Sequence, residues 1–325
     1  QPVALPIALL WLPPLVAAVG HLPGADQPGH TALSIPALMT AGLVPLWVAA
    51  GWARLRGRDL NGMVRLLRER GWLGARLVRY LALALTVTAF FGSLAQWKSA
   101  IPLFYPGFRW DAPIEAVEVL LHGDHPDRFL APLFGSPRGI LFLDRVYHTW
   151  FYMLFGLVVW QAWEADHRRL RQFWLSFALI WVGFGILLAT LLASAGPIYA
   201  ALDRGSASYD DLLARLNAAE ALGPLFVRLS AGSLWAAARQ PGFTIGDGIS
   251  AFPSLHVALA WLAALALWRV HRGLGLVGAG YALLILLGSI MLGWHYALDG
   301  EAAILGVAVV WAGTGRVAMR GDGWK

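Results

Sequence analysis

Cysteine is absent from the 325 residues of this chain. Its absence excludes disulfide bonds, catalysis by a thiolate and metal centres with cysteine ligands. A chain without cysteine is compatible with an oxidising compartment, although the absence alone does not establish one.

Charged residues are also scarce. They make up 14% of the chain, whereas about 25% is usual in soluble domains. Hydrophobic residues make up 58%, and the mean hydropathy is +0.60. Apolar stretches of roughly twenty residues, the length that a helix needs to cross a bilayer, recur along the chain. The sequence therefore predicts an all-α, polytopic membrane protein, a single helical bundle with about eight transmembrane helices.

The eight candidate spans have soft edges. The first is the weakest because it is short and interrupted by Pro13 and Pro14, and a signal segment is the alternative there. The predicted spans are Val3–Gly20, Thr31–Trp52, Ala75–Ala95, Ile140–Trp163, Phe173–Ser194, Ser254–Val270, Leu274–Gly293 and Ala302–Val317.

Basic residues cluster in four places between or after these spans. With eight spans, all four clusters fall on one side of the membrane, which the positive-inside rule makes the cytoplasm. The net charge of +6 then reflects membrane topology, so no nucleic-acid partner is expected. We expect a bacterial inner-membrane protein with its site on the periplasmic side. The clusters are 54–70, 168–171, 269–272 and 316–325.

The opposite, outer side holds two long connections, Gln96–Arg138 and Pro197–Gly248. Connections of this length are usually functional or disordered, and their aromatic content argues against disorder. Residues 210–216 have the apolar spacing of an interfacial amphipathic helix. His256, the 295–299 segment and the glycine-containing end of span five all reach this side, which predicts one site at the outer interface.

His295 and Asp299 stand four residues apart, a spacing that places two residues on one helix face. Asp299 can then hold one imidazole nitrogen while the other nitrogen faces a substrate. Ionisable groups at membrane depth are costly, which favours a function for them. Zinc binding and a purely structural pair are alternatives, but a nucleophilic histidine that attacks phosphorus fits better because a fourth metal ligand is not evident.

Pro253 and Ser254 precede His256 at the start of span six. Proline and serine suit the first turn of a helix, whose free N–H groups attract anions such as phosphate. An ordinary capped helix with an interfacial histidine is the alternative. Asp144 and His148 repeat the four-residue spacing beside Arg145, and we interpret them as a structural polar network or a head-group contact rather than a rival catalytic set.

Together, Pro-Ser-x-His and His-x-x-x-Asp resemble the type 2 phosphatidic acid phosphatase (PAP2) superfamily. Leu255 and the Gly-x-His-Tyr-x-x-Asp-Gly pattern of residues 293–300 are more similar to the branch that contains inositol-phosphorylceramide synthases and their bacterial relatives. The resemblance covers about 98–311 and includes the segments Lys98–Pro102, Pro106–Asp111, Leu143–Phe151 and Ala193–Pro197.

The resemblance implies that His295 is the nucleophile, that Asp299 orients it and that His256 protonates the leaving group. The wider superfamily has a Ser-Arg pair where this chain has Gly288 and Ser289, and its Lys-x6-Arg-Pro phosphate clamp is also absent. A transition state with spread negative charge still needs cations and other donors. The substrate-binding candidates, each with a structural role as the alternative, are Lys98, Arg109, Arg145, Ser194, Tyr199 and Ser254.

The predicted function is cleavage of a lipid phosphate ester at the outer leaflet through a phospho-histidine, without metal or cofactor. The partner is a membrane lipid phosphate, and a lipid or sugar hydroxyl is a candidate acceptor. A head-group transferase resembling inositol-phosphorylceramide synthase is the alternative, and a lipid transporter is a weaker one because no matching pair of broken helices is evident. The predicted parts are 1–74, two N-terminal spans with the basic loop; 75–317, a PAP2-like catalytic domain with a six-helix core; and 318–325, a cytoplasmic tail.

Overall fold

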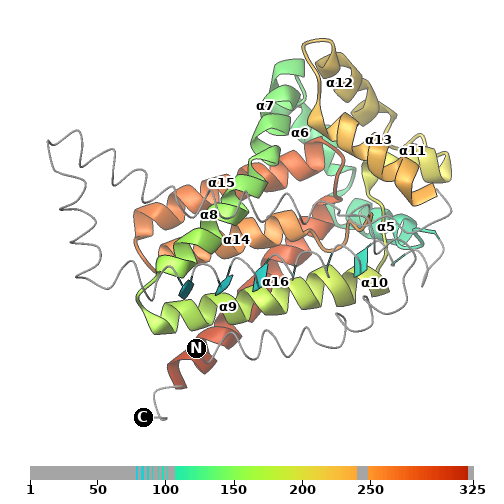
Figure 1. The fold of residues 1–325 in the computed structure, drawn as a ribbon. Helices are drawn as coiled ribbons and strands as arrows, with labels where there is room; N and C mark the ends of the chain where they lie inside the picture. Colours follow the sequence, from blue (N-terminus) through green and yellow to red (C-terminus); the bar gives the residue numbers. More distant parts are fainter. Residues whose placement is uncertain are drawn as a thin grey trace, which may run out of the picture.

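The computed structural model describes residues 107–239 and 248–320, together with scattered positions between 78 and 101. The predictions for the first two spans, for the basic loop after them and for a signal segment lie outside these residues. The described residues form helices and contain no strand, which confirms the predicted all-α fold (Figure 1).

A membrane bundle forms one end of the described structure. Three of its segments are long and apolar enough to cross a bilayer, namely His167–Leu191, Arg272–Met291 and Ala297–Met319. The first combines α9 with a π-helical segment, η1, and α10. The bundle helices are α8 (Trp150–Trp163), α9 (His167–Val182), η1 (Gly183–Leu188), α10 (Ala189–Leu191), α14 (Leu255–Trp268), α15 (Arg272–Met291) and α16 (Ala297–Arg320).

Helix α14 lies at the centre of this bundle. It packs against α8, α9, α15 and α16, and Leu259 and Leu262 on it are fully buried. A helix that is apolar around its whole circumference belongs inside a bundle, since it has no face for water. Its central position carries His256, at its first turn, into the interior. The described spans make this an integral membrane protein, and the total of eight spans stays a prediction.

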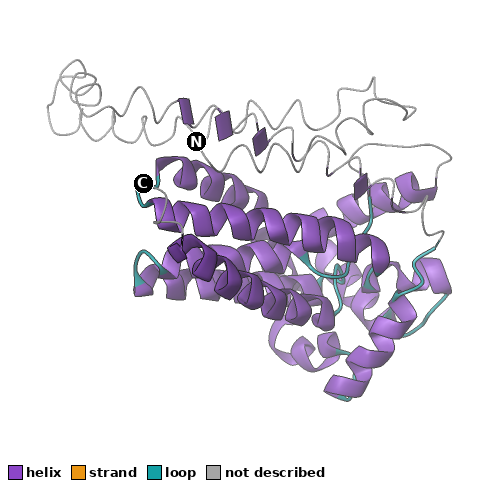
Figure 2. Ribbon diagram, turned by 90° about the horizontal axis from the view of Figure 1, so that it is seen from below, coloured by secondary structure: helices purple, strands orange, loops and turns teal. Residues whose placement is uncertain are grey.

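A second group of helices covers one end of the bundle (Figures 1 and 2), and we call it the outer cap because the sequence predicts it on the outer side. Helix α12 follows the predicted amphipathic segment, but it packs against α7, and its Leu212 and Leu216 are fully buried within the protein. The prediction of an interfacial helix is therefore wrong, because the apolar face of α12 covers protein rather than lipid. The cap consists of α5 (Asp111–His122), α6 (Pro126–Phe134), α7 (Pro137–His148), α11 (Pro197–Arg204), α12 (Asp210–Glu220) and α13 (Phe226–Arg239).

The predicted single span Ile140–Trp163 is two helices, α7 (Pro137–His148) and α8, which differ in direction (Figure 1). The break occurs at Thr149, whose hydroxyl bonds to the carbonyl of Val146 at 2.6 Å and to the hydroxyl of Tyr281 at 3.0 Å. Helix α7 carries Asp144, which binds the first N–H groups of α13, whereas α8 is largely apolar and has no charged side chain. The polar half of the predicted span thus joins the cap and leaves only α8 in the bundle.

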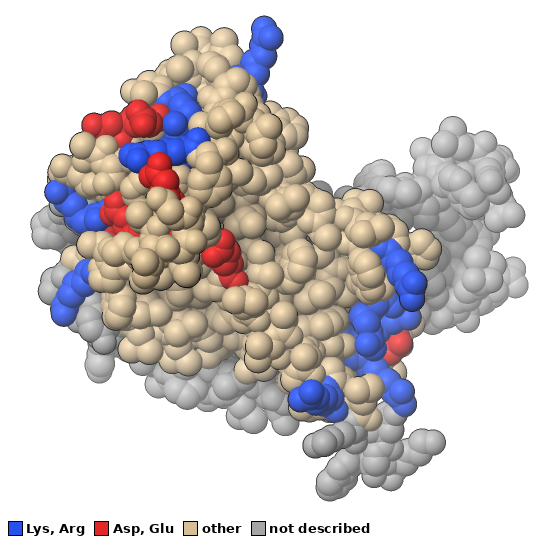
Figure 3. Space-filling model, turned by 180° about the vertical axis from the view of Figure 1, so that it is seen from behind, with Lys and Arg blue, Asp and Glu red and all other residues tan. Residues whose placement is uncertain are grey.

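Charge separates the two ends of the molecule. The α8–α9 and α14–α15 connections and the end of α16 lie together, opposite the cap (Figure 1). On one face, Lys and Arg gather at this end and mixed charges at the cap, with a largely uncharged surface between them (Figure 3). The predicted basic clusters 168–171, 269–272 and 316 therefore share one end, as a positive-inside arrangement requires.

Candidate active site

The first turn of α14 places His256. Ser254 caps the helix, with its hydroxyl accepting a bond from the Val257 N–H at 3.4 Å. The Ser254 N–H in turn donates to the Asp299 carbonyl at 3.1 Å. Ser254 is fully buried, and its hydroxyl serves this cap while its backbone N–H ties the start of α14 to the first turn of α16.

His295 lies in the turn between α15 and α16, two residues before α16 begins. Its N–H donates to the Ser289 carbonyl at 3.1 Å, and Gly293, at φ +76°, reverses the chain. The expectation that His295 and Asp299 share one helix face is therefore wrong, because α16 begins at Ala297. Instead, the carboxylate of Asp299 reaches back from the helix to the turn.

The Asp299 carboxylate is fully buried and holds two groups with the same oxygen. Its Oδ2 accepts a bond from His295 Nδ1 at 3.3 Å and one from the Tyr296 N–H at 3.1 Å. The second bond is half of a capping box, in which an acid in the first turn binds the N–H of the cap residue. Asp299 thus stabilises the helix start and leaves Nε2 of His295 as the free nitrogen.

The two histidine rings lie beside one another, with their centroids 6.2 Å apart and their planes tilted by 55°. In-line attack needs about 3–3.5 Å between nucleophile and phosphorus, and an acid acts within about 3 Å of the leaving oxygen. With the P–O bond between these two distances, the attacking and protonating nitrogens of an in-line arrangement stand about 7–8 Å apart. The observed spacing brings both rings to one site but is shorter than that span, so a bound phosphoryl group requires the two rings to move apart.

Aromatic side chains surround His256. Its ring stacks on Tyr147 at 4.8 Å and lies 4.2 Å from Trp150 and 6.4 Å from Phe151, measured between centroids. The Trp150 indole N–H also donates to the His256 carbonyl at 3.1 Å. These walls fix the ring and make its surroundings apolar, a setting in which electrostatic interactions are strong.

The end of span five is held against the His295 turn by Asp111 of the cap. Its carboxylate accepts bonds from the N–H groups of Ala195 at 2.8 Å and Gly196 at 2.9 Å, and from the Tyr296 hydroxyl at 2.9 Å. Gly196 has φ +104°, and a Cβ there would lie 2.5 Å from the Trp294 carbonyl oxygen. Only glycine permits this approach. Burial raises the pKa of Asp111, and the three bonds oppose that shift.

Ser194, a predicted substrate contact, lies beside this junction. Its hydroxyl accepts a bond from the Phe252 N–H at 3.0 Å, and its carbonyl accepts one from the Ala251 N–H at 2.8 Å. Ser194 is fully buried and joins the end of span five to the loop segment that leads into α14. Its contacts in the structure are therefore with the backbone that positions His256.

Besides His295, two groups lie close enough to His256 to act on it electrostatically, Lys98 and His148. The backbone of Lys98 lies against Gly248, where a Cβ would stand 2.3 Å from the Lys98 carbonyl carbon. Burial lowers the pKa of Lys98 to about 8, so its ammonium stays mostly protonated at pH 7. His148 donates from Nδ1 to the Asp144 carbonyl at 2.8 Å, which leaves Nε2 available.

The other predicted contacts lie in the cap. Arg145 donates to the Pro224 carbonyl at 2.9 Å and stands 4.5 Å over the Phe226 ring. Tyr199 donates to the Ala231 carbonyl at 3.3 Å. Arg109 is exposed in the turn before α5. The structure thus groups Lys98 with the histidines and gives Arg145 and Tyr199 partners within the cap.

The Asp144 carboxylate binds the first N–H groups of α13, those of Phe226 and Val227, at 2.9 Å each. His148 lies 4.8 Å from the Phe226 ring. These contacts form a structural polar network, which is one of the two roles expected for this segment; the other, a head-group contact, stays a prediction.

The sequence did not reveal the part played by Asp111 and Glu118, which belong to the long connection Gln96–Arg138. Both are 2% exposed and face the start of α16. Together with Glu115 they recur at intervals of four and three residues, which is the spacing of one helix face. That acidic stripe, in an otherwise apolar helix, was the signal available in the sequence.

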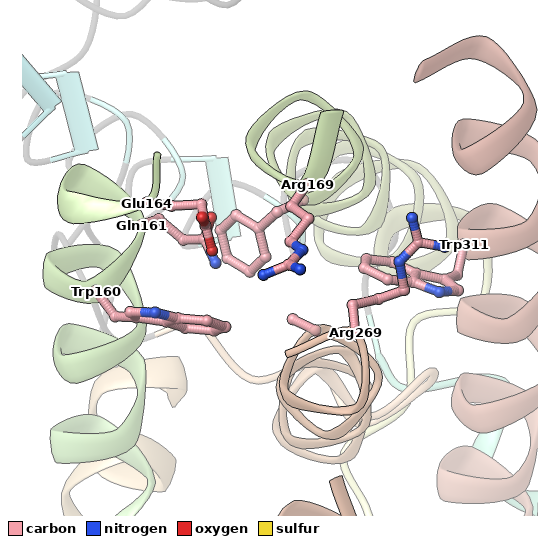
Figure 4. A pocket seen from close by; sticks show the side chains of 8 residues that line it. Trp160, Gln161, Glu164, Arg169, Arg269 and Trp311 are labelled. Atoms are coloured by element: carbon pink, nitrogen blue, oxygen red, sulfur yellow. The ribbon is translucent and has the colours of Figure 1, made fainter. Parts of the chain in front are cut away.

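A cavity at the opposite end of the bundle is distinct from this site (Figure 4). Its enclosed volume of about 10 Å³ is at the lower limit for holding one water. It cannot admit a lipid phosphate. Its lining comes from α8, α9, α14 and α16 and includes Trp160, Gln161, Glu164, Arg169, Arg269 and Trp311.

With this geometry in place, the comparisons decide the family. The family model of the PAP2 superfamily matches residues 112–315. This chain belongs to the PAP2 superfamily. No curated protein and no solved structure matches it. Membership supports phosphatase-type chemistry on lipid phosphates in general, and the matched range contains His256, His295 and Asp299.

The structure also shows what occupies the places of the superfamily's Ser-Arg pair. A Cβ at Gly288 would lie 3.2 Å from Cδ2 of Tyr147, which is the tyrosine stacked on His256. Ser289 is fully buried and donates its hydroxyl to the Leu286 carbonyl at 2.7 Å. A side chain at Gly288 would press on Tyr147, and Ser289, which stands at the arginine's place, is uncharged and bonded to the backbone, so this pair of positions supplies no cation.

Proposed function

We propose that this PAP2-superfamily protein is an integral membrane phosphatase or phosphotransferase that cleaves a lipid phosphate ester at the outer leaflet through a phospho-histidine. The observation that carries the proposal is the pair of neighbouring histidines, whose ring centroids lie 6.2 Å apart, with Asp299 bonded to Nδ1 of His295. A metal centre is not needed for this chemistry. Within the described part of the chain, no group of three His, Asp or Glu residues is placed to hold a metal ion.

In the first step, Nε2 of His295 attacks phosphorus while the ester oxygen departs. A P–N bond forms and the P–O bond to the lipid breaks. His256 transfers a proton to the departing oxygen, which leaves as an alcohol. Asp299 accepts the Nδ1–H bond and stabilises the positive charge that develops on the imidazole.

In the second step, an acceptor hydroxyl attacks the phospho-histidine and the P–N bond breaks. His256, now neutral, takes the proton from that acceptor. With a phosphomonoester substrate, water as acceptor releases inorganic phosphate and a lipid or sugar hydroxyl yields a new phosphomonoester. When the transferred phosphorus keeps a head group, as with a phosphodiester substrate, an alcohol acceptor yields a new phosphodiester. Lys98 is the cation best placed to bind the phosphoryl oxygens, since its charge already acts at His256.

The second candidate function, a head-group transferase of the inositol-phosphorylceramide-synthase kind, is supported by the walls of the site. Tyr147, Trp150 and Phe151 surround His256. Apolar walls disfavour free entry of water and favour an acceptor that carries its own lipid chain. The outer cap then selects whether water or an alcohol reaches the phospho-histidine, because it covers the end of the bundle at which His256 and His295 lie.

The test is incubation of the purified protein with a panel of lipid phosphates, with and without lipid or sugar alcohols. Free phosphate and new lipids are measured together. We expect His295→Ala and His256→Ala each to abolish both products. The control is His167→Ala, which removes an exposed histidine at the opposite end of the bundle. Turnover near the wild-type rate in either site variant contradicts the mechanism.

A further inference from the structure

The first turn of α16 needs partners for its backbone N–H groups, since the first four N–H groups of any α-helix lack carbonyl partners within the helix. Asp299 binds the N–H of Tyr296. Glu118, which belongs to α5 and lies 180 residues away in sequence, accepts a bond from the Leu298 N–H at 3.2 Å and also interacts with that of Ala297. Two carboxylates, Asp299 of α16 and Glu118 of α5, therefore bind N–H groups at the start of α16.

Glu118 is 2% exposed, so its carboxylate does not face bulk water. Asp299 on α16 acts on it electrostatically, as does His122 on its own helix. His122 is bonded to Glu301 of α16 at 2.9 Å, and the Tyr209 hydroxyl of the cap also lies within electrostatic reach of Glu118. No arginine or lysine among the described residues forms an ion pair with Glu118, unlike Glu115, which pairs with Arg204.

From this arrangement we infer that Glu118 is a positioning residue for the proposed reaction. Its carboxylate holds the first turn of α16 and thereby keeps Asp299 against Nδ1 of His295. The inference rests on the proposed function, because it assigns Glu118 a part in the same site. Glu118 itself touches neither substrate nor the nucleophile.

The effect depends on protonation. Burial raises the pKa of Glu118 to about 7, the Leu298 N–H opposes the shift and the negative charge of Asp299 adds to it. A carboxylate accepts a backbone N–H bond more strongly than a neutral carboxylic acid does. Above pH 7 the ionised group therefore holds α16 firmly, and below pH 7 the bond weakens. Turnover should fall as the pH decreases through about 7.

The test compares the wild type with Glu118→Gln, which keeps an acceptor for Leu298 but removes the titrating charge. Turnover is measured from pH 5.5 to 9 (roughly the range that brackets the carboxyl and histidine titrations), and infrared difference spectra record the protonated carboxyl band. Glu115→Gln is the matched control, one turn away on the same helix. Glu118→Asp, which restores a charge, is the second variant.

We expect a carboxyl band that titrates near pH 7 in the wild type and in Glu115→Gln but is absent from Glu118→Gln. At high pH, kcat of Glu118→Gln should be about two- to tenfold lower, the loss of one charge-assisted bond, with KM unchanged. The fall of turnover below about pH 7, the acid limb of the pH profile, should be absent from Glu118→Gln and present in Glu118→Asp.

An unchanged acid limb in Glu118→Gln overturns the inference, and so does a wild-type kcat in that variant at high pH. Failure of the proposed function looks different. In that case the wild type releases no phosphate and forms no new lipid at any pH, while the carboxyl band still titrates.

Discussion

Replacement of Asp299 by asparagine separates the electrostatic part of its role from the structural part. In the structure one oxygen, Oδ2, binds both His295 Nδ1 and the Tyr296 N–H, while Oδ1 has no hydrogen-bond partner. An asparagine can keep both bonds through its carbonyl oxygen and place its amide where Oδ1 lies. The change therefore removes a charge and leaves the geometry of the turn nearly intact.

The expected magnitude follows from the 3.3 Å separation of His295 Nδ1 and Asp299 Oδ2. In the ground state the imidazole is neutral and gains little from the carboxylate, whereas it carries positive charge as phosphorus is attacked. Two unit charges at this distance interact by about 4–5 kcal/mol at the effective dielectric constant typical of protein sites. Loss of that term predicts a kcat lower by about 10³- to 10⁴-fold.

The assay is phosphate release from the best lipid phosphate, with thermal unfolding in detergent as the measure of stability. The free energy of unfolding of Asp299→Asn should lie within about 1 kcal/mol of that of the wild type. Asp299→Ala should lose activity to a similar extent and also about 1 kcal/mol of the free energy of unfolding, because the capping bond to Tyr296 is removed. If Asp299→Asn keeps more than a tenth of the wild-type kcat, the electrostatic reasoning is refuted.

Three further predictions concern metal, charge and topology. Activity should survive EDTA and be blocked by vanadate, which mimics five-coordinate phosphorus; inactivation by the chelator with recovery on one divalent ion would show a metal enzyme instead. Burial lowers the pKa of Lys98 to about 8, so substrate affinity, measured as KM, should weaken as the pH rises through 8. The variant Lys98→Arg should remove that pH dependence. An unchanged pH profile of KM in Lys98→Arg would mean that Lys98 does not bind the phosphate. A cysteine at Ala218, exposed in the outer cap, should be labelled from outside intact cells by an impermeant thiol reagent, whereas one at Ala165, exposed between α8 and α9, should not; the reverse pattern would invert the topology.

Much of the bundle was predictable because apolar stretches of bilayer length leave few alternatives to a helix. The predicted spans Phe173–Ser194, Leu274–Gly293 and Ala302–Val317 each overlap a described span. The break at Thr149 was not predictable in the same way. Hydropathy does not reveal that Asp144 binds the start of α13, more than eighty residues away.

The candidate site shows the same division. The order of Ser254, His256, His295 and Asp299 along two neighbouring spans was enough to expect them at one membrane boundary, and the structure brings them together. Their catalytic roles stay predictions. The turn at His295 depends on Gly293, which has φ +76°. The four-residue spacing of His295 and Asp299, interpreted as helical, does not predict this turn.

The contacts of Asp111 and Glu118 could not be read from the chain, because they join residues 84 to 185 positions apart. Tertiary packing alone determines which of the acidic residues of an outer connection faces the start of α16. The acidic stripe of α5 indicated a buried polar face but not its partner.

The central claim, a phosphate carried by His295, is tested most directly by trapping the intermediate. Wild-type protein is mixed with a lipid phosphate labelled in its phosphoryl group, quenched in alkali within one turnover and digested for mass spectrometry. The account predicts phosphate on Nε2 of His295, formed at a rate no slower than turnover, and no label in His295→Ala. Turnover without a phosphorylated residue, or label on a side chain other than His295, would contradict it.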